Sequence, residues 1–263
     1  MLSSKSAKQH LAKYLKEGLR YDSRELDEYR EITIETGVSS TAEGSARVKL
    51  GKTEVIAGIK LSLETPYPDT PENGNLMVEV SLPSLASPEY ESGPPGIDAI
   101  EFSRVVDRGI REGKIIDTKK LCLRPGEKVW NVSIDIVVIN NDGNIMDASG
   151  IAAMAALLDT TMPKLEGDTV SYKEKTKNRL PISSWVVPAT VHKVGDHFLV
   201  DLTCEEEEAS DGRLTLAAKE DGRIYALQKG GDSPLSKEEL DAMLKLGLAS
   251  GKKILAKLKE VLK

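Results

Sequence analysis

The stretch RPGEKVWNVSIDIVVINNDG (residues 124–143), followed closely by ASGIAAMAALLDT (148–160), decides the fold class. The first segment is typical of a turn, a long strand and a second turn at Asp142-Gly143. The second is apolar on nearly all sides, which predicts a helix that packs against other elements on both flanks. A long strand leading into a buried helix indicates a sheet covered by helices.

Upstream of this pair, the sequence predicts more strands and one helix. Ile32 and Ile34 alternate with polar residues, and Gly51 marks a hairpin turn before the strand TEVIAGIKLSLE (53–64). Three prolines exclude a regular element from residues 64–74, and NLMVEVSL (75–82) predicts a further strand. The segment IDAIEFSRVVDRGIREGK (97–114) predicts an amphipathic helix.

Downstream the pattern starts again, although no element is predicted for the polar residues 164–184. Two hairpins are expected around Gly195-Asp196 and Asp221-Gly222, and Ser236 with Glu239 forms a capping box for a terminal helix. The chain is therefore predicted to be α+β, with two similar, pseudo-duplicated units packed together. The expected division is an N-terminal helix (1–18), a first unit (19–165) and a C-terminal unit (185–263).

Composition restricts the class of protein. Among the 263 residues, 40% are hydrophobic and 30% charged, which is typical of a soluble globular chain. The net charge of -6 implies that any nucleic-acid contact is local or is shared with a partner. No apolar run is long enough for a membrane span. Two distant cysteines without a secretory signal predict a reduced, cytoplasmic protein.

The common catalytic motifs are missing from the sequence. It has no phosphate-binding glycine loop, no Cys/His cluster at metal-ligand spacing and no nucleophile elbow, so neither a metal nor a cofactor is predicted. The acidic run CEEEEASD (204–211) could hold a divalent cation, but a solvated turn is the commoner explanation. His192 and His197 flank a predicted hairpin turn, where a surface position is favoured over a functional one.

One helix carries a stripe of arginines. Arg104, Arg108 and Arg111 recur at spacings of four and three in the segment 97–114. Guanidinium groups along one helix face suit the phosphates of a nucleic-acid backbone, because each can bind a phosphate in bidentate fashion. The alternative is a solvated face on which Glu101, Asp107 and Glu112 pair with the arginines.

In this order, the segments resemble the ribonuclease PH superfamily over nearly the whole chain. The landmarks are GLRYDSRELDEYREITIETG (18–37), EGSARVKLGKTEVIAGIK (43–60), EFSRVVDRGIREGK (101–114), VSIDIVVINNDGN (132–144) and VDLTCEEEE (200–208). Two further stretches, 66–96 and 117–130, are similar to the non-catalytic ring subunits of archaeal exosomes. The fold that this resemblance implies is a pair of ββαβα-type units, in agreement with the pattern above.

Two departures from the active relatives bear on function. Where those relatives carry small residues and an arginine that hold the attacking phosphate, this chain has Asn144-Ile145-Met146. Where they carry two aspartates, it has Glu207 and Arg213. The resemblance therefore implies a chain with no catalytic residues of its own, whose Arg104, Arg108 and Arg111 contact RNA beside a partner's site.

The implied assembly is a hexameric ring in which three copies alternate with three catalytic ribonuclease PH-like siblings, with RNA-binding cap proteins and RNA as further partners. The expected role is to bind RNA and to complete the sibling's phosphorolytic 3′–5′ exoribonuclease site. No membrane is expected among the partners. Two alternatives remain open, namely a self-sufficient phosphorolytic exonuclease and a small-molecule enzyme on a related α+β fold.

Overall fold

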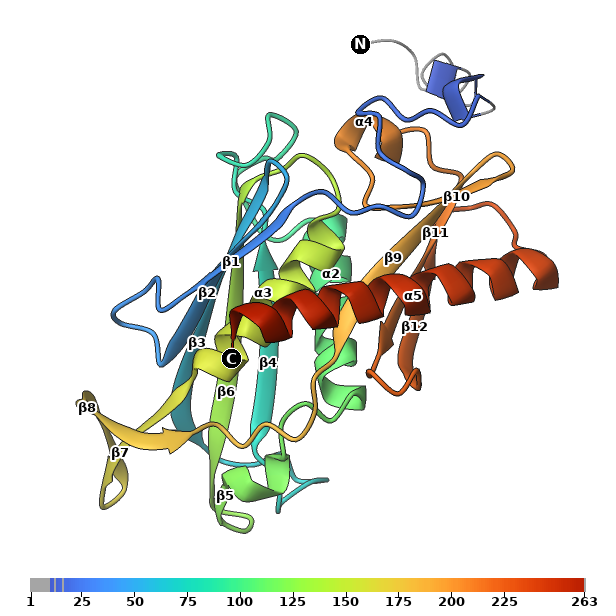
Figure 1. The fold of residues 1–263 in the computed structure, drawn as a ribbon. Coiled ribbons are helices and arrows are strands. Elements are labelled where there is room, and N and C mark those ends of the chain that lie inside the picture. The colour runs from blue at the N-terminus through green and yellow to red at the C-terminus, as the bar shows by residue number, and fades with distance from the viewer. Residues whose placement is uncertain (1–9, 12, 16, 263) are drawn as a thin grey trace.

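The computed structural model describes residues 10, 11, 13–15 and 17–262 (Figure 1). Its first sheet has the strand order β1-β2-β3-β6-β4, with the short β5 paired to β6. Every second residue of β3 is buried over most of its length, because alternate side chains of a strand point to opposite faces. The strands are β1 (Ile32–Thr36), β2 (Gly44–Leu50), β3 (Thr53–Glu64), β4 (Asn75–Ser81), β5 (Cys122–Arg124) and β6 (Lys128–Asn140).

Two helices lie between this sheet and the rest of the molecule. The helix α2 (Ile97–Glu112) packs on β4, and α3 (Ile145–Asp159) packs on β2 and β3 on one side and on the later strand β9 on the other. Small residues allow this close approach, since a Cβ at Gly150 would stand 2.2 Å from Pro188 Cγ. The prediction that this helix packs on both flanks is confirmed. A short 3-10 helix, η1 (Thr118–Leu121), precedes β5.

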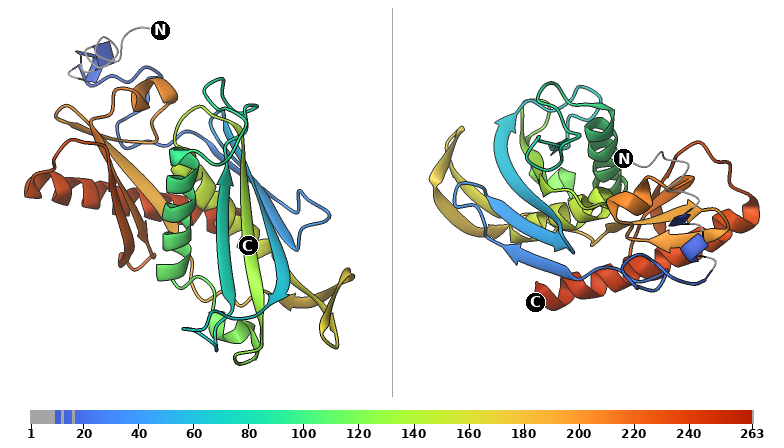
Figure 2. Two further views of the ribbon diagram at one scale, coloured as in Figure 1. Left: turned by 180° about the vertical axis from the view of Figure 1, so that it is seen from behind. Right: turned by 90° about the horizontal axis from the view of Figure 1, so that it is seen from above.

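The second sheet is antiparallel, with the order β10-β9-β11-β12, and α5 packs on β9 and β11. Figure 2 shows α2 and α3 between the two sheets. The predicted capping box is confirmed, because Ser236 Oγ accepts from the amide of Glu239 and the Glu239 carboxylate accepts from the amide of Ser236. The elements are β9 (Val187–Val194), β10 (His197–Val200), α4 (Cys204–Glu207), β11 (Gly212–Ala218), β12 (Ile224–Gly230) and α5 (Lys237–Val261).

The predicted α+β class is confirmed. The first unit runs β1-β2-β3-β4-α2-η1-β5-β6-α3, so it contains a ββαβα order from β3 to α3, with two strands in front of it and the short η1 and β5 inserted before β6. The second runs β9-β10-α4-β11-β12-α5 and therefore has one strand more than the ββαβα pattern, because its last two strands form a hairpin. The predicted limits of the two units remain a prediction.

For two segments, the structure adds what the sequence pattern did not predict. Much of the predicted helix over 1–18 lies outside the described residues, but 10, 11 and 13–15 are helical, and Leu11 and Leu15 pack in a small core with Leu199. The unassigned polar stretch forms the hairpin of β7 (Thr161–Glu166) and β8 (Thr169–Arg179), which projects from the body (Figure 1) and so lacks a buried alternating face. No helix in the described part of the chain is long and apolar enough to cross a membrane.

Candidate functional site

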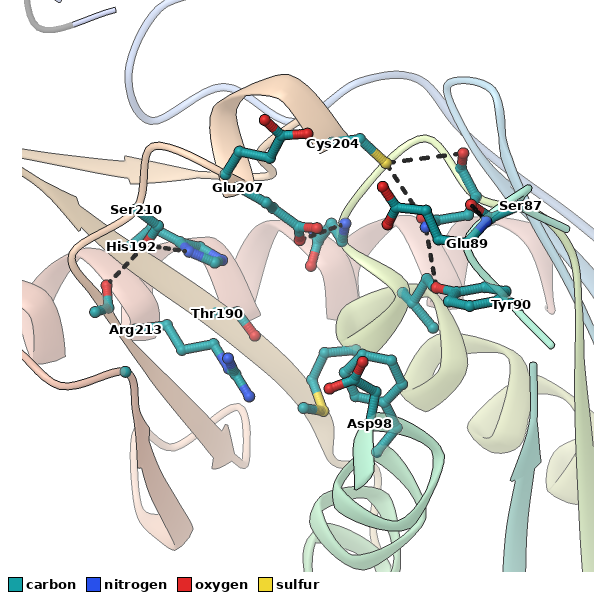
Figure 3. Close-up of a pocket in the computed structure, with 18 of the residues that line it drawn as sticks. Ser87, Glu89, Tyr90, Asp98, Thr190, His192, Cys204, Glu207, Ser210 and Arg213 are labelled. Atoms are coloured by element: carbon teal, nitrogen blue, oxygen red, sulfur yellow. Dashed lines mark hydrogen bonds between the residues drawn. The ribbon is translucent and has the colours of Figure 1, made fainter. Parts of the chain in front are cut away.

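A cavity of about 500 Å³ lies between the two units, where the N-terminal end of α2 and the start of α3 face β9 and α4 (Figure 3). Its walls also include the loop 87–90 and the stretch 204–213. These segments are distant in sequence, so only the tertiary fold brings them together. The lining side chains labelled in Figure 3 include Tyr90, Asp98, Thr190, His192, Glu207 and Arg213.

The turn that leads into α3 is held in one conformation. Thr53 Oγ1 donates to the carbonyl of Gly143 at 2.6 Å and accepts from the amide of Asp142 at 3.1 Å. Gly143 has a φ of 87°, and a Cβ there would stand 2.3 Å from the Leu202 carbonyl oxygen, so only glycine fits. Asn144 follows with a φ of 56°. The amide that opens α3 is therefore fixed in direction.

That amide is already occupied by a side chain of the chain itself. Glu207 Oε1 accepts a hydrogen bond from the backbone N–H of Asn144 at 2.9 Å. The next two residues, Ile145 and Met146, are each 4% exposed and offer no polar side chain. A helix N-terminus attracts an anion, and here the acceptor is an internal carboxyl group. The position where the resemblance places the attacking phosphate in active relatives is thus filled from within.

Burial changes the pKa values of two groups in this cavity. Desolvation raises the pKa of Glu207 to about 7, although the Asn144 amide and Arg213 act in the opposite direction. Burial lowers the pKa of His192 to about 3, so the imidazole is neutral at neutral pH. Neither group supplies a positive charge for a phosphate.

The lining carries more acidic than basic groups. Among the described residues that line it, Arg213 is the one guanidinium, and its Nη2 lies 2.6 Å from Glu101 Oε2 on α2. The acidic lining residues are Glu89, Asp98, Glu207 and Glu208. Such a cavity repels a phosphate instead of concentrating it. The sequence comparison identified Glu207 and Arg213 as departures but did not predict these two contacts.

The prediction that His192 lies at the surface is wrong. Its side chain is 5% exposed, and Nδ1 lies 3.0 Å from Ser210 Oγ. The reason is the sheet order, in which β9 is an inner strand between β10 and β11. A hairpin pattern in the sequence gives the turn but not the strand that pairs on its other side.

The acidic run 204–211 is not a solvated turn in its middle. Glu206 is fully buried and receives two hydrogen bonds from Arg20, one from Nε at 2.9 Å and one from Nη2 at 2.6 Å. It also forms a capping box with Thr203 at the start of α4. Glu205 and Glu208 are exposed on the same helical turn. The spacing of Thr203 and Glu206 is that of a capping box, so the sequence alone could have predicted the start of α4.

A second buried carboxylate joins the N-terminal segment to the second unit. Asp201 has a φ of 49° and lies within hydrogen-bonding distance of Arg24 Nη1 (3.0 Å), Arg30 Nη2 (2.7 Å) and Asn144 Nδ2 (2.9 Å). Burial alone would raise the pKa of Asp201, but the hydrogen bonds and charge of Arg30 hold it below its usual range. The landmark segments 18–37 and 200–208 therefore meet around this residue.

The three predicted RNA-binding arginines lie along the exposed side of α2 but have different surroundings. Arg104 is exposed and has no hydrogen-bond or ion-pair partner among the described residues. Arg108 Nη1 donates to Gln228 Oε1 on β12 at 3.0 Å, a neutral partner that leaves its charge uncompensated.

Arg111 differs from the other two. Its Nη2 lies 2.8 Å from Asp107 Oδ1, and its Nε donates to Asp107 Oδ2 at 3.1 Å. The same Nη2 donates to the Leu76 carbonyl of β4 at 3.2 Å. The hydrogen bonds that Arg111 donates to the Asp107 carboxylate raise the pKa of Arg111 above its ordinary value. Its charge is therefore partly neutralised, as the solvated-face alternative expected for this position.

Comparison with known proteins places the chain in a family. The sequence profile of the 3′ exoribonuclease family matches residues 28–163 with its domain 1 and residues 185–250 with its domain 2. This chain belongs to the 3′ exoribonuclease family. The predicted resemblance to the ribonuclease PH superfamily is confirmed, and so is the predicted fold type.

Members of the 3′ exoribonuclease family with similar sequences are named Exosome complex component Rrp42. The protein from Pyrococcus horikoshii is 46% identical over 239 residues, which cover 88% of this chain and 85% of that protein. The protein from Sulfurisphaera tokodaii is 41% identical over 262 residues and covers 98% and 95%. A solved structure, the Archaeoglobus fulgidus exosome with RNA bound to the active site, contains a chain with a TM-score of 0.90 and 38% identity, covering 98% of this chain and 99% of that chain.

Proposed function

We propose that this chain is an exosome subunit of the Rrp42 type that has no phosphorolytic site of its own. The hydrogen bond from the Asn144 amide to Glu207 carries the proposal, because it fills the anion position at the start of α3. The acidic lining and the apolar side chains of Ile145 and Met146 support it. Among the described lining residues, the Asn144 amide is taken by Glu207, and the one guanidinium, that of Arg213, is paired with Glu101.

The family and the exposed arginines of α2 support a proposed role within the exosome. Three copies alternate with three catalytic ribonuclease PH-like siblings in a hexameric ring in the cytoplasm, with RNA-binding cap proteins on the ring. Arg104 and Arg108 bind phosphates of the RNA beside the sibling's active site, and Arg111 contributes less because Asp107 pairs with it. The sibling cleaves from the 3′ end with inorganic phosphate, and this chain holds the substrate in place.

Phosphate-dependent degradation of a 5′-labelled RNA by this chain alone, by the sibling alone and by the mixture tests the proposal. We expect no activity from this chain alone and strong activity only from the mixture. Nucleoside diphosphate release by this chain alone, with contaminating nuclease excluded, would instead establish the alternative of a self-sufficient phosphorolytic exonuclease. Product analysis distinguishes phosphorolysis from hydrolysis, which releases monophosphates.

A further inference from the structure

A second cavity, of about 700 Å³, lies at the C-terminal end of α2, away from the cavity between the two units. It is formed by the loop 65–74, the end of α2, η1 and the start of the segment after β11. Its size falls in the range of ordinary ligand sites. The charged and aromatic residues that line it are Tyr67, Arg111, Lys114, Asp117, Lys119 and Lys219.

Its charge is opposite to that of the first cavity. Lys114, Lys119 and Lys219 have no carboxylate partner among the described residues, and the Lys219 ammonium lies 4.3 Å from the ring centre of Tyr225. Among the described residues that line this cavity, Asp117 is the one acidic residue, and it pairs at 3.4 Å with Lys120, which is not a lining residue. In a chain of net charge -6, this is a local excess of positive charge.

The walls of this second cavity are held in place by hydrogen bonds. The Gly74 amide donates to the Thr118 carbonyl at 2.8 Å and ties the loop 65–74 to η1. The Asp117 amide donates to the Pro181 carbonyl at 3.0 Å, which fixes the start of η1 against the segment between β8 and β9. Arg111 is held by Asp107 and Leu76. A binding site whose walls are already fixed loses little conformational entropy when a ligand enters.

We propose that this second cavity binds single-stranded RNA, with Lys114, Lys119 and Lys219 around a backbone phosphate and Tyr67 stacked on a base. Tyr67 is 53% exposed at the rim, and its hydroxyl has no partner among the described residues, so the ring is open to a base. Phosphate contacts beside an aromatic platform are the usual combination in proteins that bind single strands without sequence preference. The proposal rests on the proposed RNA-binding role, and it places a second contact at the other end of the helix that carries Arg104.

The test measures the affinity of a 5′-labelled oligoadenylate for the ring assembled with the catalytic sibling, by fluorescence anisotropy and without inorganic phosphate. We compare Lys114→Glu/Lys119→Glu and Tyr67→Ala with Arg104→Glu/Arg108→Glu. A matched control, Lys237→Glu/Lys252→Glu, makes the same charge change at exposed positions of α5 that do not line the cavity. Thermal melting and size-exclusion chromatography show that each variant folds and assembles.

The lysine variant is expected to bind about tenfold more weakly than the control, with a salt slope reduced by about 0.7 for each phosphate that the variant no longer neutralises. Tyr67→Ala is expected to weaken binding about fivefold or more, since stacking on an aromatic ring stabilises each base. Control-level affinity of both cavity variants, with weaker binding by the arginine variant, would overturn this inference and leave the proposed function standing. Weaker binding by the cavity variants alone would support the inference and contradict the role of the arginines.

Discussion

Glu207 Oε1 accepts a hydrogen bond from the backbone N–H of Asn144 at 2.9 Å. This contact joins α4 of the second unit to the start of α3 in the first unit. The sequence resemblance aligns this point of the chain with the segment that holds the attacking phosphate in active relatives. Here the carboxyl group of Glu207, from the same chain, accepts the hydrogen bond of the Asn144 amide at the start of the helix. The same contact therefore links the two units and, in the proposed function, takes the place of a bound phosphate at the Asn144 amide.

The Glu207 contact predicts a pH effect on stability. The pKa of Glu207 in the folded protein, about 7, lies above its unfolded value. The contribution of the protonated Glu207 to the free energy of unfolding is fully present below the unfolded pKa, near 4.5, and is lost as the pH rises through 7. Glu207→Gln keeps an oxygen acceptor for Asn144 and removes the charge. We expect the variant to be more stable than wild type by about 3 kcal/mol at pH 8 and equal to it near pH 4.

Urea unfolding of both proteins at a series of pH values measures that difference. Glu208→Gln is the matched control, because Glu208 is the exposed neighbour and has no contact with Asn144. The assembled ring with Glu207→Gln should degrade RNA at the wild-type rate, because the proposed function gives Glu207 no part in the chemistry. A large drop in rate without disassembly would show that the first cavity takes part in catalysis.

Charge reversal on the outer face of α2 tests RNA capture. Arg104→Glu with Arg108→Glu should leave the ring assembled, because Arg104 has no partner among the described residues and Arg108 has only the neutral Gln228. RNA affinity should fall about tenfold or more, because the phosphates are no longer neutralised and the glutamates repel them. Filter binding at two salt concentrations checks this. Wild-type affinity in the double variant would rule out the arginine stripe as an RNA contact.

Arg111 should behave differently from Arg104. Its guanidinium binds the Leu76 carbonyl on the edge strand β4, so Arg111→Ala should cost about 1 kcal/mol and lower the melting temperature by about 2–4 °C. Arg104→Ala should leave the melting temperature unchanged because the side chain is exposed and unpaired within the described structure. Differential scanning calorimetry of the two single variants measures this. Equal melting temperatures would mean that the contact with β4 contributes nothing.

Arg20 and Glu206 form a buried ion pair, so removing one partner should destabilise the protein more than removing both charges. Arg20→Met leaves the Glu206 carboxylate buried without its cation and should destabilise the protein by about 3–5 kcal/mol. Adding Glu206→Gln removes the stranded charge and keeps an oxygen acceptor for the Thr203 amide, so the double variant should recover most of the stability. Guanidinium unfolding of the wild type and the two variants gives the comparison. A double variant as unstable as Arg20→Met would argue against an electrostatic cause.

Much of the fold could be predicted because local patterns agree with it. The alternation in 53–64, the turn glycine Gly51 and the Ser236–Glu239 box each specify a local conformation, and the structure has each of them. The hairpin of β7 and β8 was missed because it has no apolar face to reveal its period. The burial of His192 was missed because strand neighbours in a sheet come from distant segments.

For the candidate site, the sequence determined which residue types are present: Asn144-Ile145-Met146 in place of a phosphate-binding segment, and arginines at helical spacing on α2. Only the tertiary structure decided what they contact. It brought Glu207 onto the Asn144 amide, Asp107 onto Arg111, and three lysines around one cavity. The physical reason is that charge and residue type belong to the sequence, whereas burial, pKa and pairing depend on neighbours that only the folded chain supplies.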